Sequence, residues 1–156
     1  SEKVVFIPAF VGLSSPHWIP DSKAMIYGLT PSINKNHIVR ASLESIAFQI
    51  KDYLDDLEKN NKIKYNDIYI DGGIVSNKSF IQLLCDTLQK KIHVTNYQDM
   101  SSYGALMMGL LGMNIISNFK EMKKLKQKYL VYSPIKNKKI ADSYKYWQYI
   151  LKKFYL

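Results

Sequence analysis

Cysteine is nearly absent from this sequence, since Cys85 is the only one among 156 residues. A single cysteine excludes an internal disulfide, and its position in the apolar run FIQLLCDTL predicts a small buried side chain rather than a reactive thiol. The three histidines, His17, His37 and His93, are scattered along the chain without cysteine neighbours. This pattern argues against a zinc site, so we expect each histidine to act as a cap, surface or packing residue.

Long apolar runs are also absent, and none approaches the roughly 20 residues of a membrane-spanning helix. The chain opens with neither a signal peptide nor an initiator methionine, and it enters a strand-like segment at once. We therefore expect a piece of a longer cytoplasmic protein that has no membrane partner.

What the sequence does contain is ordinary for a folded domain, with 47% hydrophobic and 22% charged residues. This composition argues against disorder. A chain of 156 residues is long enough to build a proper core without disulfide or metal staples. The sequence therefore predicts a single domain over residues 1–156.

The net charge of +9 is confined to one end of the chain. Residues 1–119 carry eleven basic and eleven acidic residues, whereas residues 120–156 carry eleven lysines and two acidic residues. Such an excess is compatible with a nucleic-acid or anionic membrane surface. The segment has no arginine, the residue favoured for bidentate phosphate contacts, and its lysines alternate with apolar positions. We interpret residues 118–156 as a lysine-rich helical tail packed on the domain, with a solvated lysine face and no nucleic-acid partner.

Hydrophobic periodicity and turn residues divide the chain into alternating strands and helices. Glycine and proline residues mark 11–22 as a loop, and Gly28 is expected at a bulge or a close backbone approach. The order strand, strand, long helix, strand, helix, strand and then further helices indicates an α/β domain. The predicted strands are 3–10, 24–30, 67–71 and 91–95, and the predicted helices begin at Asn34 or Asn36, near Asn77, at Ser101 or Ser102, at 118 and at 140.

Four of these helices have faces whose environment the sequence predicts. A helix as poor in charge as residues 104–110 is expected to be buried, with its glycines in close contact with another element. In the other three helices, apolar residues recur at helical spacing on one face. These faces are Val39, Leu43, Ile46, Ile50, Tyr53 and Leu57 in the long helix, Phe80, Ile81, Leu84 and Leu88 in the next, and Ile140, Tyr144, Trp147, Leu151 and Phe154 in the last.

The most informative local feature is IYIDGGIVSN, residues 68–77, where a strand leads through paired glycines into a helix. The missing Cβ atoms of Gly72 and Gly73 let a ligand approach the backbone closely. The helix N-terminus beyond them offers free N–H groups and the positive end of the helix dipole, which together suit a nucleotide. Asn77 can either cap its own helix or point its amide at the ligand.

The same feature is also typical of an ordinary tight turn. Neither the Walker pattern GxxxxGK[ST] nor the dinucleotide fingerprint GxGxxG is present. Asp71 suits a carboxylate near a metal, but a strand-end aspartate that stabilises its own turn is the commoner case.

A longer pattern runs from Ala24 to Glu44, AMIYGLTPSINKNHIVRASLE. A small and an apolar residue precede Gly28-Leu29, His37-Ile38 follows seven residues later, and Ala41-Ser42-Leu43-Glu44 closes the pattern. This pattern resembles the second signature of the FGGY carbohydrate kinases. Within that family the chain is most similar to the glycerol kinases, in the segments IPAFVGLSSPHW, ASLESIAFQIKD, DGGIVSNKSFIQLLCD and SSYGALMMGLLG.

The resemblance implies an actin-like, ribonuclease H-like ATPase domain with a mixed sheet flanked by helices, the second of two domains around a cleft. It implies that Gly73 and Asn77 contact ATP and that Gly72 shapes the turn. The N-terminal domain of the same protein then supplies the catalytic aspartate, the glycerol contacts and most of the Mg²⁺ site. We therefore expect part of a homo-oligomeric kinase that transfers phosphate from ATP to glycerol, and a chain that is inactive alone, with no catalytic or metal residue of its own.

Three alternatives stay open at this point. Another FGGY kinase, acting on a pentulose or a hexulose, would retain the same segments. An actin- or Hsp70-like interaction domain would bind a nucleotide through the same kind of glycine-containing loop, although the pattern from Ala24 to Glu44 argues against it. A basic nucleic-acid binder is the third.

Overall fold

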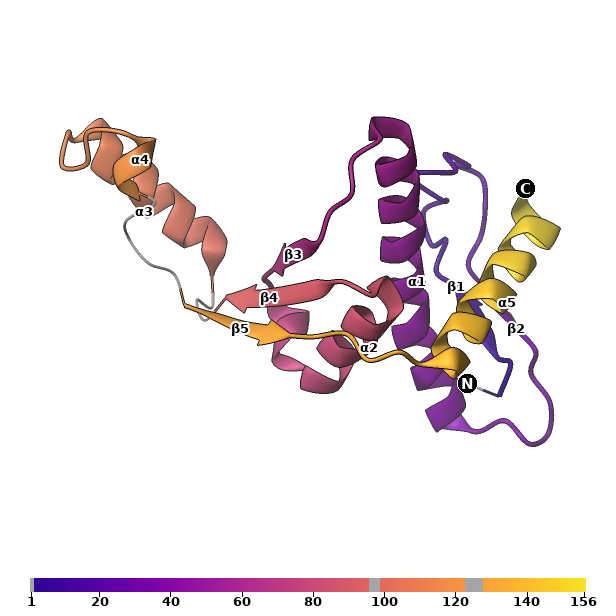
Figure 1. Ribbon diagram of the computed structural model, residues 1–156. Helices are drawn as coiled ribbons and strands as arrows, with labels where there is room; N and C mark the ends of the chain where they lie inside the picture. Colours follow the sequence, from indigo (N-terminus) through magenta and orange to yellow (C-terminus); the bar gives the residue numbers. More distant parts are fainter. Residues whose placement is uncertain (1, 96–98, 123–127) are drawn as a thin grey trace.

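The computed structural model describes residues 2–95, 99–122 and 128–156 of the chain. Helices alternate with strands along it, and the strands form two separate sheets (Figure 1). The α/β class predicted from the sequence is therefore confirmed. In chain order the elements are β1 (Val5–Ile7), β2 (Met25–Tyr27), α1 (Lys35–Asn61), β3 (Asp67–Ile70), the 3-10 helix η1 (Gly73–Ser76), α2 (Lys78–Leu88), β4 (Lys91–Thr95), α3 (Met100–Gly112), α4 (Phe119–Met122), β5 (Tyr129–Tyr132) and α5 (Lys138–Tyr155).

One sheet is a short antiparallel pair and the other is mixed. In the pair, β1 lies beside β2, with Phe6 opposite Ile26. The mixed sheet has the order β3-β4-β5, in which β3 runs parallel to β4 and β5 runs antiparallel to β4. The helix α2 connects β3 to β4, as a parallel pair requires, and packs against β4 and β5. Because β3 and β4 are parallel, their carboxyl ends meet at the same edge of the sheet.

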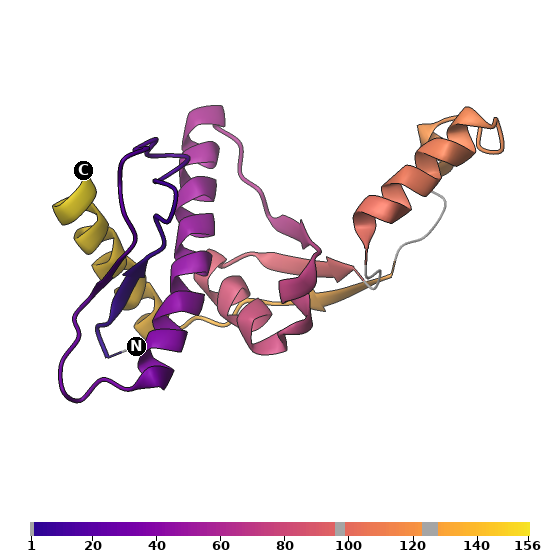
Figure 2. The same cartoon turned by 180° about the vertical axis from the view of Figure 1, so that it is seen from behind.

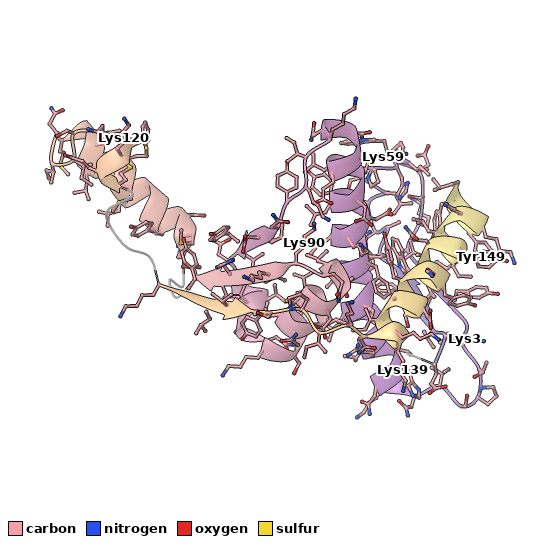
Figure 3. All side chains as sticks on the ribbon, viewed as in Figure 1. Lys3, Lys59, Lys90, Lys120, Lys139 and Tyr149 are labelled. Carbon is pink, nitrogen blue, oxygen red and sulfur yellow. The ribbon has the colours of Figure 1, made fainter. Side chains whose placement is uncertain are left out.

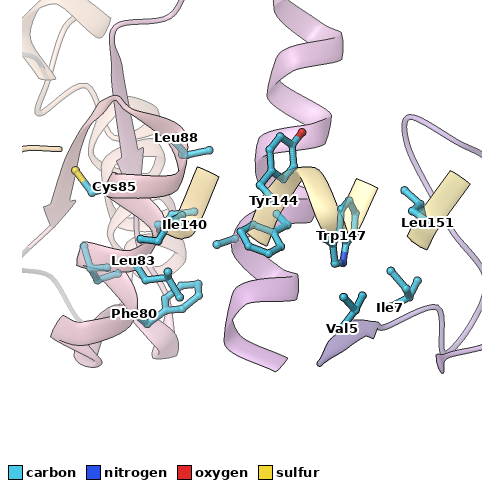
Figure 4. Packing of buried hydrophobic residues seen from close by; sticks show 14 of the residues in the cluster. Val5, Ile7, Phe80, Leu83, Cys85, Leu88, Ile140, Tyr144, Trp147 and Leu151 are labelled. Atoms are coloured by element: carbon cyan, nitrogen blue, oxygen red, sulfur yellow. The ribbon is translucent and has the colours of Figure 1, made fainter. Parts of the chain in front are cut away.

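The core lies where α5 meets α1, α2 and β1 (Figure 4). Trp147 of α5 is 2% exposed, and its Nε1 donates a hydrogen bond to the carbonyl oxygen of Phe6 at 3.0 Å. The indole also lies 6.0 Å from the ring of Phe48 in α1, measured between ring centroids. Ile140, at the other end of α5, belongs to the same buried cluster as Phe80 of α2. Helix α5 therefore joins the elements around β1 to those around α2.

Cys85 is fully buried on α2, as the sequence predicts. Its thiol donates to the carbonyl oxygen of Lys90 at 3.1 Å. Burial, and then the carboxylate of Asp86, raise the pKa of this thiol to about 11. The group is therefore a neutral thiol at physiological pH, which confirms its interpretation as a small hydrophobic residue.

Asparagine and aspartate side chains cap the helices. Asn34 caps α1 and Asn77 caps α2, both as the sequence predicts. The predicted cap of α3, Ser101 or Ser102, is wrong. The cap is Asp99, because its carboxylate accepts a hydrogen bond from the backbone N–H of Ser102 at 3.0 Å. The hydrogen bonds from Ser102 also lower the pKa of Asp99, which keeps the cap charged.

Helix α1 buries a different face from the predicted one. Val39, Ile46 and Tyr53 are exposed, so the predicted stripe is wrong at these positions. Small side chains on the inner face, such as Ala41 and Ala47, let β1 and α5 approach the helix closely. The buried residues of α1 are Ala41, Glu44, Ser45, Ala47 and Phe48.

Helix α2 agrees with its predicted pattern, since Phe80, Ile81, Leu84 and Leu88 are all buried. The helix is strongly amphipathic and covers one face of the mixed sheet.

Helix α3 departs most from expectation. Met107 is its only buried residue, so the prediction of a buried helix is wrong. An added Cβ at Gly104 or Gly109 would meet no atom within 4 Å, so these glycines do not mark a close contact within the described chain. Both views show α3 and α4 projecting away from the rest of the molecule (Figure 1 and Figure 2). No helix in the described residues is both long and apolar enough to span a membrane.

The lysine-rich end of the chain contains a strand as well as helices. Residues 129–132 form β5, which the sequence did not predict. The predicted basic helix, 118–128, is described only at its start, where α4 lies, and residues 123–127 fall outside the described residues. The final helix α5 buries Ile140, Tyr144, Trp147 and Leu151 as predicted, but Phe154 is 47% exposed and Ile150 is buried in addition.

Glu58 and Lys90 tie the end of α1 to the start of β4. Lys90 Nζ lies 2.6 Å from Glu58 Oε1 and donates to the carbonyl oxygen of Tyr65 at 2.7 Å. The backbone N–H of Tyr65 donates to the same glutamate oxygen at 2.7 Å. Figure 3 shows Lys90 between the sheet and α1. The hydrogen bonds from Lys90 and Tyr65 lower the pKa of Glu58 from its ordinary value of 4.5.

Glu58 should therefore contribute a pH-dependent part of the stability. A carboxylate whose folded pKa is lowered stabilises the fold above its ordinary pKa, and this contribution is lost as the pH falls through the lowered value. We expect Glu58→Gln to show a smaller loss of unfolding free energy between neutral and acid pH than the wild type. Urea unfolding at a series of pH values measures this difference. The control Lys59→Met, at the neighbouring exposed position, should keep the wild-type pH dependence, and an unchanged dependence in Glu58→Gln would contradict the assignment.

Candidate functional site

The strand-glycine-helix corner occupies the carboxyl edge of the mixed sheet. Strand β3 ends at Ile70, and η1 follows Gly72 at once. Two backbone hydrogen bonds close this turn, from Val75 N–H to the carbonyl oxygen of Gly72 at 3.2 Å and from Asn77 N–H to that of Ile74 at 3.0 Å. Helix α2 then begins directly at the end of η1. The corner is therefore a short, hydrogen-bonded bend between two regular elements.

The two glycines have different roles in this bend. Gly72 has a φ of 98°, a conformation that residues with a Cβ rarely adopt. Gly73 has no positive φ, so the backbone conformation alone does not require glycine there. An added Cβ at either position would meet no atom within 4 Å. The turn therefore needs glycine at 72, whereas the glycine at 73 leaves open space in front of the backbone.

Asn77 both caps α2 and keeps a free donor. Its Oδ1 accepts a hydrogen bond from the backbone N–H of Phe80 at 3.0 Å, which is the capping role that the sequence left open. Its Nδ2 has no partner among the described residues, and the residue is exposed. The first N–H groups of α2 also lack partners within the helix. The corner therefore presents several donors and the positive end of a helix dipole to solvent.

A hollow of about 150 Å³ lies beside the corner, where β3 and β4 end. It was not predictable from the sequence, because its walls come from the end of β3, the end of β4, the start of α3 and the start of β5, which come together only in the fold. Carboxyl ends of parallel strands are where open α/β sheets commonly bind ligands. The residues that line it are Tyr69, Ile70, Asp71, Thr95, Met100 and Tyr129.

Each of the three histidines has a polar partner within the fold. His37 Nδ1 accepts from the backbone N–H of Asn34 and completes the capping box of α1. His17 Nε2 lies 2.6 Å from a carboxylate oxygen of Asp52. His93 Nε2 lies 2.8 Å from the carboxylate of Asp67. Among the described residues, no group of three or more His, Cys, Asp or Glu side chains could hold a metal ion.

Residues of the longer sequence pattern from Ala24 to Glu44 make structural contacts between β1, β2 and α1. At Gly28, φ is +87° and an added Cβ would lie 2.6 Å from the carbonyl oxygen of Lys3, so the predicted close approach is confirmed. Arg40 Nε donates to Glu44 Oε1 at 2.7 Å, and the Glu44 side chain is 7% exposed. These contacts hold β2 against β1 and fix the start of α1, which explains the spacing in structural terms.

Comparison with known proteins identifies the family. A family model for the C-terminal domain of the FGGY family of carbohydrate kinases matches residues 1–113. The chain belongs to the FGGY family. The resemblance carried by the pattern from Ala24 to Glu44 is therefore confirmed.

Relatives within the FGGY family include glycerol kinases. That of Shewanella amazonensis is 37% identical over 120 residues, which is 77% of this chain. That of Vibrio cholerae is 35% identical over 122 residues, which is 78% of this chain. Each match covers 24% of the relative, so the chain spans about a quarter of the length of these enzymes.

Solved structures of FGGY kinases share the fold. Plasmodium falciparum glycerol kinase with ADP matches with a TM-score of 0.83 and 33% identity, over 98% of this chain and 31% of that one. A ligand-bound xylulose kinase from Lactobacillus acidophilus matches with a TM-score of 0.79, and its 22% identity supports the fold alone. The predicted actin-like, ribonuclease H-like fold with a mixed sheet between helices is confirmed by these neighbours.

Proposed function

We propose that Gly72, Gly73 and Asn77 form one wall of an adenine-nucleotide pocket in a kinase that phosphorylates glycerol with ATP. The observation that carries the proposal is the open space in front of the two glycines. Glycerol kinases that are 35–37% identical to about three quarters of the chain support the choice of substrate. The Plasmodium falciparum glycerol kinase that shares this fold contains ADP, which supports the choice of cofactor.

These residues contribute binding and orientation. Because Gly73 has no side chain, the nucleotide can lie directly against the backbone. The Oδ1 of Asn77 is engaged by Phe80, so its Nδ2 is the group that remains to donate to the ligand. Phosphoryl transfer depends mostly on positioning and on stabilisation of charge. A fixed wall that holds adenosine therefore contributes to the reaction without acting as an acid or a base.

Mg²⁺ and the catalytic base belong, in this proposal, to the rest of the enzyme. When bound, Mg²⁺ would supply positive charge that offsets the charge of the phosphates during transfer. The corner offers backbone amides and a carboxamide nitrogen, which are donors and suit phosphate or purine rather than a cation. Asp71 is the acidic group nearest in sequence, and within the described part of the chain it belongs to no group of three or more ligands that could hold a metal ion.

We propose that the partner of this chain is the N-terminal domain of the same FGGY kinase. The apolar side chains of α3 support this, because Leu106 and Met108 are each more than half exposed. The outer edge of β3 supports it as well, since no strand of the described residues pairs with that edge. A cytoplasmic location, a homo-oligomeric parent and a single domain over residues 1–156 stay predictions from the sequence.

Another sugar kinase of the FGGY family is the second candidate. The fold neighbours include xylulose and gluconate kinases, at 22% identity or less. Glycerol is favoured because the glycerol kinases are markedly more similar in sequence to this chain.

Substitution of Gly73 tests the nucleotide wall. We expect Gly73→Val to weaken ADP binding about tenfold or more, because the new side chain fills the space assigned to the nucleotide. The backbone at this position needs no positive φ, so the fold should tolerate valine. ADP titration followed by NMR chemical shifts suits a weak complex of this chain, and urea unfolding checks the fold.

The matched control is Gly112→Val, at the end of α3. An added Cβ there also meets nothing within 4 Å, so this variant makes the same chemical change far from the corner. Its ADP affinity should equal that of the wild type. If Gly73→Val folds normally and binds ADP as the wild type does, the corner is not the nucleotide wall.

A further inference from the structure

A second hollow, of about 620 Å³, lies between α1, α2 and the first half of α5. Its volume falls within the usual range of small-molecule sites, about 300–1,000 Å³, and carbon atoms, including those of polar side chains, form most of its surface. No residue of the corner formed by Gly72, Gly73 and Asn77 takes part in it. The lining residues on which the argument depends are Lys51, Thr87, Lys136, Lys138, Tyr144 and Lys145.

The floor of this hollow offers an apolar surface. Tyr144 and Thr87 are both buried, and their hydroxyl groups are engaged within the protein. The Tyr144 hydroxyl donates to Asp52 at 3.3 Å and to Asp55 at 3.4 Å. The Thr87 hydroxyl donates to the carbonyl oxygen of Leu83 at 2.7 Å. Lys51 Nζ lies over the Tyr144 ring, 5.3 Å from its centroid. The surface that remains for a ligand is mostly carbon, to which Ala141 contributes, and it suits a flat apolar group.

The rim of the hollow is basic. Lys136, Lys138 and Lys145 form no ion pair with any described residue. Lys51 differs, since its Nζ pairs with Asp55 at 3.1 Å. Lys138 and Lys145 are seven residues apart on α5, which places them about 10 Å apart on the same side of the helix. Side chains of this length can reach a single anion between them.

The acidic residues near this rim are fewer than the lysines, since Asp86 is the one carboxylate in the lining beside Lys51, Lys136, Lys138 and Lys145. Asp86 Oδ1 accepts hydrogen bonds from the backbone N–H of Ile135 at 2.8 Å and from Gln82 Nε2 at 2.7 Å. Asp142 lies on α5 between Lys138 and Lys145, but it lines a different hollow, beside β1. The rim therefore holds an excess of positive charge that an anionic ligand would complement.

We propose that this hollow binds a small molecule that joins a flat apolar group to a phosphate or a carboxylate. The apolar group lies on the floor beside Tyr144, and the anion lies among Lys136, Lys138 and Lys145. The site is separate from the nucleotide corner, because the two lie at opposite ends of α2. Asn77 begins that helix and Leu88 ends it, so the separation along the helix axis is about 16 Å.

Binding of 1-naphthyl phosphate tests this proposal, because the probe combines a flat ring with a dianion. Isothermal titration or NMR titration of the whole chain gives the affinity. We expect Lys138→Glu/Lys145→Glu to weaken binding roughly tenfold or more, since two favourable charges become unfavourable. Lys152→Glu/Lys153→Glu is the matched control, with the same charge change on the same helix outside the hollow, and it should bind as the wild type does.

Two further measurements test the apolar floor and the basic rim separately. The uncharged analogue 1-naphthol and inorganic phosphate alone should each bind more weakly than 1-naphthyl phosphate, because each uses half of the site. Ala141→Trp should also reduce binding, since the indole fills the hollow from α5. The proposal would be overturned if both double lysine variants lost the same affinity for 1-naphthyl phosphate. It would also be overturned if 1-naphthol bound to the wild type as tightly as 1-naphthyl phosphate does.

The outcome is distinguishable from that of the nucleotide proposal. Gly73→Val should leave 1-naphthyl phosphate binding unchanged, and the variant at Lys138 and Lys145 should leave ADP binding unchanged. Competition between ADP and 1-naphthyl phosphate for one site would assign the probe to the corner and reject the second site.

Discussion

Trp147→Ala is expected to lower the free energy of unfolding by about 3–5 kcal/mol, the usual cost of removing a large buried aromatic side chain. Trp147 is 2% exposed and contacts Phe48 of α1. Its removal leaves a cavity where α5, α1 and β1 meet, and it leaves the carbonyl oxygen of Phe6 without its hydrogen-bond donor. The loss should therefore affect both halves of the core that α5 joins.

Urea unfolding followed by far-ultraviolet circular dichroism measures this loss. Tyr149→Ala is the control, because it removes another large aromatic side chain from the same helix. Tyr149 is 56% exposed, and among the described residues its ring stacks only on Tyr146, so its removal should cost less than about 1.5 kcal/mol. Similar losses in the two variants would show that α5 is not anchored through Trp147.

Gly28→Ala should have the second largest effect, a loss of roughly 2–5 kcal/mol from backbone strain and overpacking together. The φ of Gly28 is +87°, and an added Cβ would lie 2.6 Å from the carbonyl oxygen of Lys3. Backbone atoms cannot rotate away as a flexible side chain can. The added methyl group should therefore push β2 away from the segment before β1.

The same urea titration measures this variant, and Gly109→Ala in α3 is its control. An added Cβ at Gly109 meets nothing within 4 Å, and φ there is not positive. Alanine favours helix by about 0.5–1 kcal/mol over glycine, so this control should be neutral or slightly stabilising. If Gly28→Ala proves as stable as the control, then the tight approach to Lys3 does not constrain the fold.

Local chemistry explains what the sequence could predict of this fold. The start of α2 was predictable because Asn77 is a good cap and the apolar residues after it repeat with the helical period. The buried face of α1 was not predictable. Large apolar residues such as Val39 and Ile46 form a stripe at helical spacing but are exposed, whereas small residues such as Ala41 are buried against the rest of the fold. Strand β5 was hidden in a lysine-rich stretch, and its pairing with β4 is what makes it a strand.

The candidate sites also differ in whether the sequence alone could predict them. The corner was predictable because Gly72, Gly73 and Asn77 lie within six consecutive residues. Its neighbouring hollow and the lysine-rimmed hollow were not, because each is assembled from residues that are far apart in the sequence. The uncharged composition of α3 predicted a buried helix, but only Met107 is buried in the structure. Composition alone does not tell which segment, if any, covers such a helix.

The projection of α3 from the body has a consequence for how an FGGY kinase is made. Leu106 and Met108 of α3 face water until the partner that we propose, the N-terminal domain of the same kinase, covers them. Synthesis runs from the N-terminus, so that domain would leave the ribosome before α3 does and could already be folded when α3 appears. The order of synthesis would then shorten the time for which these apolar side chains are exposed to solvent.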